Sequence, residues 1–201
     1  MFKHYILTRY NSGLFTDNPY KIEDKGLYMD SRLPWFKKHL KSLDNQTNQS
    51  FTHVVSIDPN TPEEYLRPIL NAVYFAKTNS VFVYEKHIDW LKRQHKEEWL
   101  ITSRLDNDDE YYPEFVETIQ KNFKKERMVY DILTEKNGVT SGRGKNNSPF
   151  TTLFEPWTEG FKTIFSGGGH TELPKYYKCV RLPYGKALGK INVHGTNAYY
   201  K

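Results

Sequence analysis

Apolar runs and amphipathic stretches alternate along most of this chain. Runs that predict strands cover residues 2–10, 51–57, 81–84, 99–106 and 128–134. Stretches with helical spacing lie between them, at residues 31–43, from 61 onward, within 85–98 and at 115–123. Such alternation predicts an α/β fold with a mostly parallel central sheet that helices cover on both faces.

Local signals set the expected helix ends. Ser31 as the cap, with Pro34 in the first turn, predicts where the first helix begins. The segment Thr61-Pro62-Glu63-Glu64 has the pattern of a capping box, and Pro68 should kink or shorten the helix that follows. Residues 136–149 are polar and rich in Gly and Asn, which predicts a loop.

Composition narrows the class of protein. The 201 residues suit a single domain, and the net charge of +5 suits an acidic ligand without requiring a nucleic acid. Cys179 is the only cysteine, which excludes an internal disulfide and fits a reducing compartment. Neither a signal peptide nor a membrane-length apolar run is present, so we expect a cytoplasmic protein with at most peripheral membrane contact.

Three carboxylates follow the strand at residues 99–106 and dominate the candidate chemistry. Asp106, Asp108 and Asp109 fall within four residues. Ligands of open α/β sheets bind at the carboxyl ends of the strands, and clustered like charges repel each other unless a cation lies among them. Carboxylate oxygens suit Mg²⁺ or Mn²⁺. The pattern therefore predicts a divalent metal that holds an anionic substrate, with a diphosphate as the first candidate.

Other interpretations of the cluster are weaker. An acidic helix N-terminus near Pro113 explains one or two of the carboxylates but not all three. An EF-hand starting at Asp106 is excluded because its sixth position is Tyr111 rather than Gly, and Pro113 interrupts the loop. His194 follows a short apolar run, and by spacing alone it is better explained as a structural histidine than as a ligand.

Glycines and acids in the last third offer a possible base. The run Gly167-Gly168-Gly169 fits equally a plain turn or a close backbone approach to a ligand. Glu172 follows this run and is the first candidate for a general base, with Glu159 and Glu155 as alternatives. A solvent-exposed glutamate in a turn explains Glu172 equally well.

Six segments in order carry a resemblance to a known family. They are Thr8-Arg9-Tyr10-Asn11, a helix with Arg32 and Trp35, Asp44-Asn45-Gln46-Thr47, Thr102 to Asp109, Gly168-Gly169-His170-Thr171 and Val193-His194-Gly195-Thr196-Asn197. Together they resemble the rhamnosyltransferase family of bacterial and phage glycosyltransferases, which has a GT-A fold. The resemblance covers nearly the whole chain.

The resemblance implies a metal-dependent glycosyltransferase that uses a nucleotide diphosphate sugar as its donor. It assigns Asp108 as the main ligand of Mn²⁺ or Mg²⁺, Asp106 as a contact of the metal or the ribose, and His194 as a late metal ligand. It also implies that Asp58 contacts the nucleobase and that Thr8 and Arg9 contact the nucleotide first.

The same resemblance sets the expected partners and organisation. A single domain spans residues 1–201, with a nucleotide-binding half at 1–110 and an acceptor-side half at 111–201. The acceptor is a glycan or glycolipid, as in polysaccharide biosynthesis, and no nucleic acid is involved. From the chemistry rather than the resemblance, Arg104 or Arg143 would help to stabilise the charge of the leaving diphosphate, and Glu172 would act as base. A metal-dependent phosphoesterase and a non-catalytic sugar- or nucleotide-binding protein are the alternatives.

Overall fold

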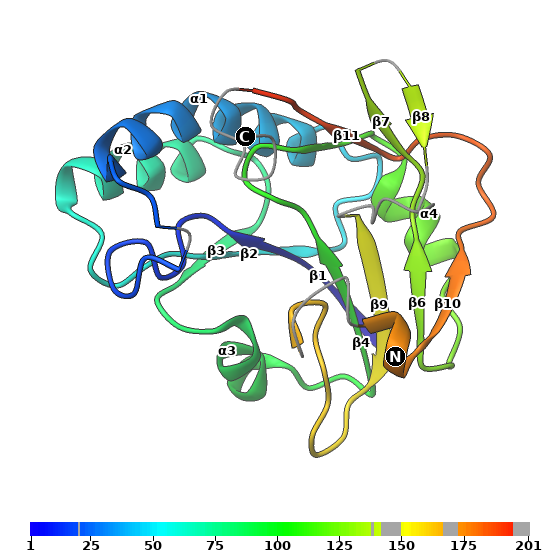
Figure 1. The fold of residues 1–201 in the computed structure, drawn as a ribbon. Helices are drawn as coiled ribbons and strands as arrows, with labels where there is room; N and C mark the ends of the chain where they lie inside the picture. The colour runs from blue at the N-terminus through cyan, green and yellow to red at the C-terminus, as the bar shows by residue number, and fades with distance from the viewer. Residues whose placement is uncertain (20, 138, 142–149, 167–172, 195–201) are drawn as a thin grey trace.

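A seven-stranded sheet forms the centre of the protein. The computed structural model describes residues 1–194 except 20, 138, 142–149 and 167–172 (Figure 1). The strands of this sheet are β1 (Phe2–Arg9), β2 (Thr52–Ser56), β3 (Ser80–Val83), β4 (Trp99–Arg104), β6 (Met128–Asp131), β9 (Thr151–Pro156) and β10 (Lys178–Arg181). Their order is β10-β6-β9-β4-β1-β2-β3, and only β9 runs antiparallel to its neighbours. The predicted α/β fold with a mostly parallel sheet is confirmed.

Helices cover both faces of this sheet. They are α1 (Lys25–Asp44), α2 (Glu63–Tyr74), α3 (His87–Gln94), α4 (Phe115–Lys121) and the short α5 (Leu173–Tyr176). In Figure 1, α1 and α2 lie side by side above β2 and β3, and α3 lies on the opposite side. Successive residues of a strand face opposite layers, so Ile101 packs with Phe115 of α4 while Leu100 packs with Leu91 of α3. No helix in the described part of the chain is long and apolar enough to cross a bilayer.

A second, four-stranded sheet brings the end of the chain to the acidic segment. It consists of β5 (Glu110–Tyr111), β7 (Thr134–Lys136), β8 (Val139–Ser141) and β11 (Gly189–Ile191), in the order β5-β11-β7-β8. Lys190 of β11 pairs with Glu110 of β5, directly after the three carboxylates. The segment 136–149 is therefore not entirely a loop as predicted, because β8 forms a hairpin with β7.

The first helix begins earlier than its sequence signals predict. Asp24 is the cap, and its Oδ1 accepts a hydrogen bond from the backbone N–H of Leu27 at 2.8 Å. The Ser31 hydroxyl instead donates to the carbonyl of Tyr28, one turn back. Burial of Met29 supplies the tertiary packing that extends the helix, so Pro34 lies inside α1 rather than in its first turn.

The second helix also departs from prediction. The Thr61 hydroxyl donates to the Asp58 carbonyl at 2.6 Å rather than capping the helix, and the N-cap residue Pro62 makes no side-chain capping bond. α2 continues through Pro68 to Tyr74 without ending early. The buried side chains of Ile69 and Val73 hold this part of the helix against the sheet.

Candidate functional site

Charged residues collect where the parallel strands end. β1, β2, β4 and β6 all finish at one edge of the sheet, and the pairing of Leu7 with Arg104 sets β1 and β4 in register there. This edge carries Arg9, Asp58, Asp131 and the segment 104–109. In an open α/β sheet, it is the edge where ligands bind.

Arg104 and Asp106 form a two-point ion pair. Nε and Nη2 of Arg104 donate to the two carboxylate oxygens of Asp106 at 2.9 and 2.6 Å. The Tyr111 hydroxyl donates to the Arg104 carbonyl at 2.5 Å and holds the backbone there. The two-point geometry fixes the plane of the guanidinium, so Arg104 presents an oriented cation at the edge.

Asp108 is buried beside a second arginine and an imidazole. Nη1 of Arg32 donates to Oδ2 of Asp108, and Nε2 of His194 lies 3.0 Å from the same oxygen. A carboxylate oxygen only accepts, so the imidazole presents an N–H to Asp108. Burial and the Arg32 charge lower the pKa of His194, although Asp108 opposes this shift. The structure thus brings together two of the three residues predicted to bind a metal.

One face of α1 makes three contacts with this edge. Arg32, Trp35 and His39 follow each other at spacings of three and four residues, which places them on the same side of the helix. The ring of Trp35 stacks on that of His194, with centroids 4.7 Å apart and an angle of 14°. Nδ1–H of His39 donates to the Asp106 carbonyl at 3.0 Å, and burial lowers the pKa of His39 to about 4. The helix therefore holds both the acidic segment and the end of the chain.

Asn192 ties the chain end to the acidic segment. Its backbone N–H donates to Oδ1 of Asp109 at 3.0 Å, and its side-chain amide donates to the Asp108 carbonyl at 2.8 Å. Burial raises the pKa of Asp109 well above its usual range, and the charges of Asp108 and Asp106 raise it further. Asp109 therefore supports the local structure rather than facing a ligand.

Arg9 and Arg104 lie near the same aromatic ring at the edge. Their guanidinium carbons lie 4.5 Å and 5.6 Å from the centroid of the Phe165 ring. Arg9 is exposed, whereas Arg104 is buried against Asp106. Two guanidinium groups at the ends of adjacent parallel strands are suited to binding an anion such as a diphosphate.

Two predicted nucleotide contacts have partners within the protein. The Thr8 hydroxyl is buried, donates to the Leu105 carbonyl at 2.8 Å and lies 3.0 Å from Nε2 of His53. The Asp58 carboxylate accepts hydrogen bonds from the backbone N–H groups of Phe15, Thr16 and Asn60 and from the Thr16 hydroxyl. Burial alone would raise the pKa of Asp58, but these hydrogen bonds outweigh it and lower the pKa.

Neither of the candidate bases that the structure describes lies at the functional edge of the sheet. Glu172 lies outside the described residues. Glu155 pairs with Leu100 at the start of β4, and Glu159 follows the end of β9, so both lie toward the edge opposite Asp106. The antiparallel direction of β9 causes this placement, and the sequence pattern did not reveal it.

Asp131 is an acid at the functional edge that the sequence analysis did not single out. It is buried at the end of β6, and its Oδ2 accepts from Nε of Arg181 at 2.7 Å. Its pairing with Thr151 places it two strands from β4, at the same edge as Arg104. No strand-end signal marked it, because the strand predicted at residues 128–134 extends three residues beyond the end of β6.

The arrangement does not fit a resident divalent ion at the predicted ligands. Both oxygens of Asp106 accept from Arg104, while Oδ2 of Asp108 accepts from Arg32 and His194. Over the described part of the chain, no three His, Cys, Asp or Glu side chains are grouped to hold a metal ion. The sequence-based assignment of Mn²⁺ or Mg²⁺ therefore stays a prediction.

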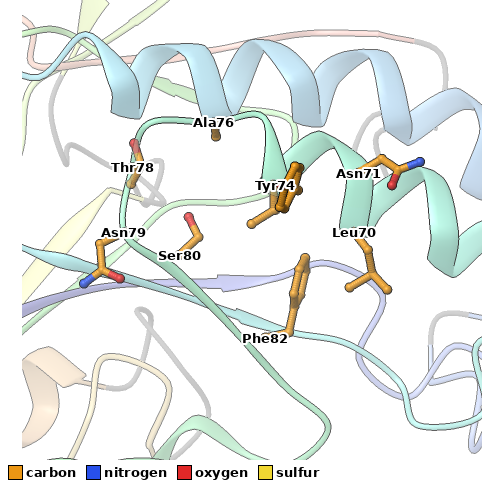
Figure 2. A pocket seen from close by; sticks show the side chains of 9 residues that line it. Leu70, Asn71, Tyr74, Ala76, Thr78, Asn79, Ser80 and Phe82 are labelled. Atoms are coloured by element: carbon orange, nitrogen blue, oxygen red, sulfur yellow. The ribbon is translucent and has the colours of Figure 1, made fainter.

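A separate open cavity of about 580 Å³ lies between the end of α2 and β3. Figure 2 shows the side chains of Leu70 and Tyr74 reaching it from α2 and that of Phe82 from β3. Its polar lining consists of amides and hydroxyls, without Asp, Glu, His, Lys or Arg side chains. The ionisable groups needed for acid–base chemistry are at the other site.

The solved structures that this chain is similar to are distant from it. The inositol-1-phosphate CTP transferase from T. maritima is 12% identical, with a TM-score of 0.40 over 94% of this chain and 88% of that chain. Mouse xyloside xylosyltransferase 1 in its apo form is 13% identical, with a TM-score of 0.35 over 67% of this chain and 53% of that chain. Among curated proteins, no significant match to the chain was found.

The sequence profile of one family covers more than half of the chain. The family described as "Putative rhamnosyl transferase" matches residues 22–141. The matched segment includes α1 with Arg32, the strand end at Asp58 and the whole acidic segment. This chain belongs to the rhamnosyl transferase family.

Proposed function

We propose that this protein is a glycosyltransferase that moves a sugar from a nucleoside diphosphate sugar to a hydroxyl group of a glycan or glycolipid. Rhamnose is the first candidate for the sugar because of the family. The observation that carries the proposal is the placement of Arg9 and Arg104 beside Phe165, at the edge where the parallel strands end. The acidic segment at the same edge lies within the part of the chain that matches the family.

The proposed chemistry is displacement at the anomeric carbon. The bond from that carbon to the β-phosphate oxygen breaks, and negative charge develops on the departing diphosphate. Arg9 reaches this charge from β1 and Arg104 from β4. Because the pair with Asp106 holds the Arg104 guanidinium in place, little reorganisation is needed when the charge forms.

The acceptor hydroxyl must also lose a proton. In an inverting transfer, a base has to lie on the side of the anomeric carbon opposite the leaving diphosphate. Glu172 remains the candidate that its neighbouring glycines favour. Among the described residues, Asp131 is the candidate that shares the edge with Arg104, whereas Glu155 and Glu159 lie toward the other edge.

The proposal can be distinguished from its alternatives. A metal-dependent phosphoesterase commonly uses two grouped metal ions, and the described residues offer no such group of ligands. A pure binding protein would bind a nucleotide sugar without turning it over. Slow hydrolysis of the donor and transfer to an added acceptor would therefore identify a transferase.

A thermal-shift screen is the first experiment. Nucleoside diphosphates with different bases, and their sugar conjugates, should be tested with and without Mn²⁺. A ligand that binds only the folded protein raises the unfolding midpoint by mass action. Arg9→Met should reduce the shift, and Arg67→Met on the exposed face of α2 is the matched control. Lack of any shift with every nucleotide would contradict the proposal.

A further inference from the structure

Arg32 and Asp108 form a buried ion pair that joins α1 to the acidic segment. Only 5% of the Arg32 side chain and 8% of the Asp108 side chain are exposed. The exposed pair between Arg67 and Glu63 on α2 contrasts with it, since those side chains are 72% and 76% exposed. Burial removes the screening by water that makes most surface pairs weak.

Each member of this pair needs the other. A guanidinium carries a full positive charge, so a buried arginine requires a counter-ion. Removing the partner of a buried charge leaves that charge uncompensated, which is strongly unfavourable. Asp108 is therefore committed to Arg32 as a counter-ion, and Arg32 supplies positive charge at the carboxylate where the family resemblance predicts a metal.

The surroundings hold Arg32 in this position. Met29 and Phe36 on the same helix are buried against the core, and the guanidinium carbon lies 4.9 Å from the Tyr28 ring centroid. His39, two turns further on, is fixed by its bond to the Asp106 carbonyl. The helix is therefore anchored on both sides of Arg32, and a metal that takes Oδ2 of Asp108 would have to displace the arginine side chain.

His194, like Arg32, acts as a hydrogen-bond donor to Asp108. Its ring is held flat against Trp35, and it gives an N–H rather than a lone pair to Asp108. The two groups that would have to face a shared metal instead face each other as donor and acceptor. Arg32 and His194 together place two donors on one carboxylate oxygen.

We propose that Arg32 is the resident cation of the acidic segment, and that a divalent metal can bind Asp108 only by displacing it. The inference concerns the cluster itself; its consequence for the donor rests on the proposed function. If that function holds, the diphosphate meets protein cations, and added metal competes with Arg32 instead of filling a vacant position.

Mn²⁺ binding to the purified full chain tests the proposal directly. Electron paramagnetic resonance of free Mn²⁺ should show weak binding to the wild type. Arg32→Met uncovers the negative charge of Asp108 and should bind Mn²⁺ at least about tenfold more tightly. Arg32→Lys retains a cation and should stay near the wild type. Arg67→Met removes an equal charge from an exposed pair and should change nothing.

A second variant keeps the test valid if Arg32→Met does not fold. Arg32→Gln is neutral but keeps amide donors for Asp108, so it should fold more readily than Arg32→Met and still bind Mn²⁺ more tightly than the wild type. In either variant, Mn²⁺ should raise the unfolding midpoint more than it does in the wild type. Micromolar Mn²⁺ binding by the wild type, or equal affinity in the wild type and the neutral variants, would overturn the proposal.

The outcome is separable from that of the proposed function. If no nucleoside diphosphate binds the wild type, the glycosyltransferase proposal fails, but the Mn²⁺ comparison among the Arg32 variants still decides this inference. If nucleotides bind and the Arg32 variants show no gain in Mn²⁺ affinity, the function stands and the role of Arg32 is wrong.

Discussion

Asp58 and Asp108 both lie just beyond buried parallel strands, yet their surroundings differ in kind. Backbone N–H groups and a hydroxyl satisfy Asp58, and its partners belong to the neighbouring loop residues Phe15, Thr16 and Asn60. A guanidinium from α1 and an imidazole from the chain end satisfy Asp108. Neutral donors order a loop, whereas charged donors set the electrostatics of a site. The partners, rather than the position, separate the two aspartates.

The largest effect is expected from Asp108→Asn. The variant keeps the shape but removes the charge opposite Arg32, so unfolding should cost about 3 kcal/mol less than in the wild type. Transfer should fall by about a hundredfold or more because the site's charge balance changes. Urea titration and a transfer assay measure the two effects.

The control for this prediction is Glu63→Gln, which breaks an exposed pair with Arg67. Its stability should change by no more than about 0.5 kcal/mol. Wild-type stability and transfer in Asp108→Asn would show that the buried pair has no special role, and the contrast with Asp58 would disappear.

The second prediction concerns Asp58→Asn. The amide can accept at one atom only, so some donors of the loop lose their partner and stability should fall by about 2 kcal/mol at pH 7. The folded pKa of Asp58 lies below its unfolded value, so its contribution is present above the unfolded pKa of about 3.9 and is lost as the pH falls through the folded pKa.

Nucleotide affinity sharpens this second test. If Asp58 only orders its loop, a folded Asp58→Asn protein should show the stability loss with a small change in nucleotide affinity. A selective loss of affinity for one nucleobase, with stability unchanged, would instead support the contact implied by the family resemblance. Thermal shifts with several nucleoside diphosphates distinguish the two outcomes.

A third prediction extends the comparison from the two aspartates to the buried imidazole of His4. Burial lowers the pKa of His4 to about 3, and its Nε2 lies 2.8 Å from the Ser103 hydroxyl. The unfolded chain takes up a proton near pH 6.5 while the folded protein does not. His4 therefore lowers stability progressively as the pH falls below 6.5, by about 2 kcal/mol at pH 5.

His4→Gln should remove the part of the stability loss at low pH that is due to His4. Whatever its stability at pH 7, the variant should lose about 2 kcal/mol less than the wild type between pH 7 and pH 5, as measured by urea unfolding at each pH. Arg67→Gln, which changes an exposed side chain and leaves His4 in place, should follow the wild type. Parallel pH profiles for His4→Gln and the wild type would show that His4 is protonated in the folded protein.

The smallest expected effect is that of Thr16→Val. Its hydroxyl donates to Oδ1 of Asp58 at 2.9 Å, and the other donors to that carboxylate remain in the variant. Stability should fall by about 1 kcal/mol with donor binding unchanged. A larger loss than in Asp58→Asn would mean that Thr16 matters through contacts other than this hydrogen bond.

The positions of the acids at the sheet edge were predictable from the sequence, but their partners were not. Apolar runs located the strands, and their ends located Asp58 and Asp106. Arg32 contacts Asp108, 76 residues further along the chain, because α1 packs across that edge. No local sequence pattern predicts such a contact. His39 and His53 have no meaningful sequence spacing, yet their rings meet in the core, with Nε2 atoms 3.2 Å apart.

The direction of the strands was the other feature that the sequence pattern did not predict. The alternation of strands and helices predicted parallel neighbours, so the reversal of β9 was not foreseen, and Glu155 appeared as a candidate base. Asp131 was missed because the apolar run predicted a strand through residue 134, which placed this acid in mid-strand, whereas β6 ends at Asp131. Side-chain burial likewise decided where α1 begins, since Met29 packs in the core before the expected start at Ser31.

The contacts made by α1 constrain its length as well as its sequence. Arg32 and His39 are seven residues apart, which corresponds to about 10 Å along the axis and nearly two full turns. One inserted residue between them would rotate one contact by about 100° relative to the other, so both could not meet the acidic segment. Insertions before Asp24 or after Asp44 leave this phase unchanged. The number of residues between Arg32 and His39 is therefore fixed by these contacts, and α1 can vary in length only outside this interval.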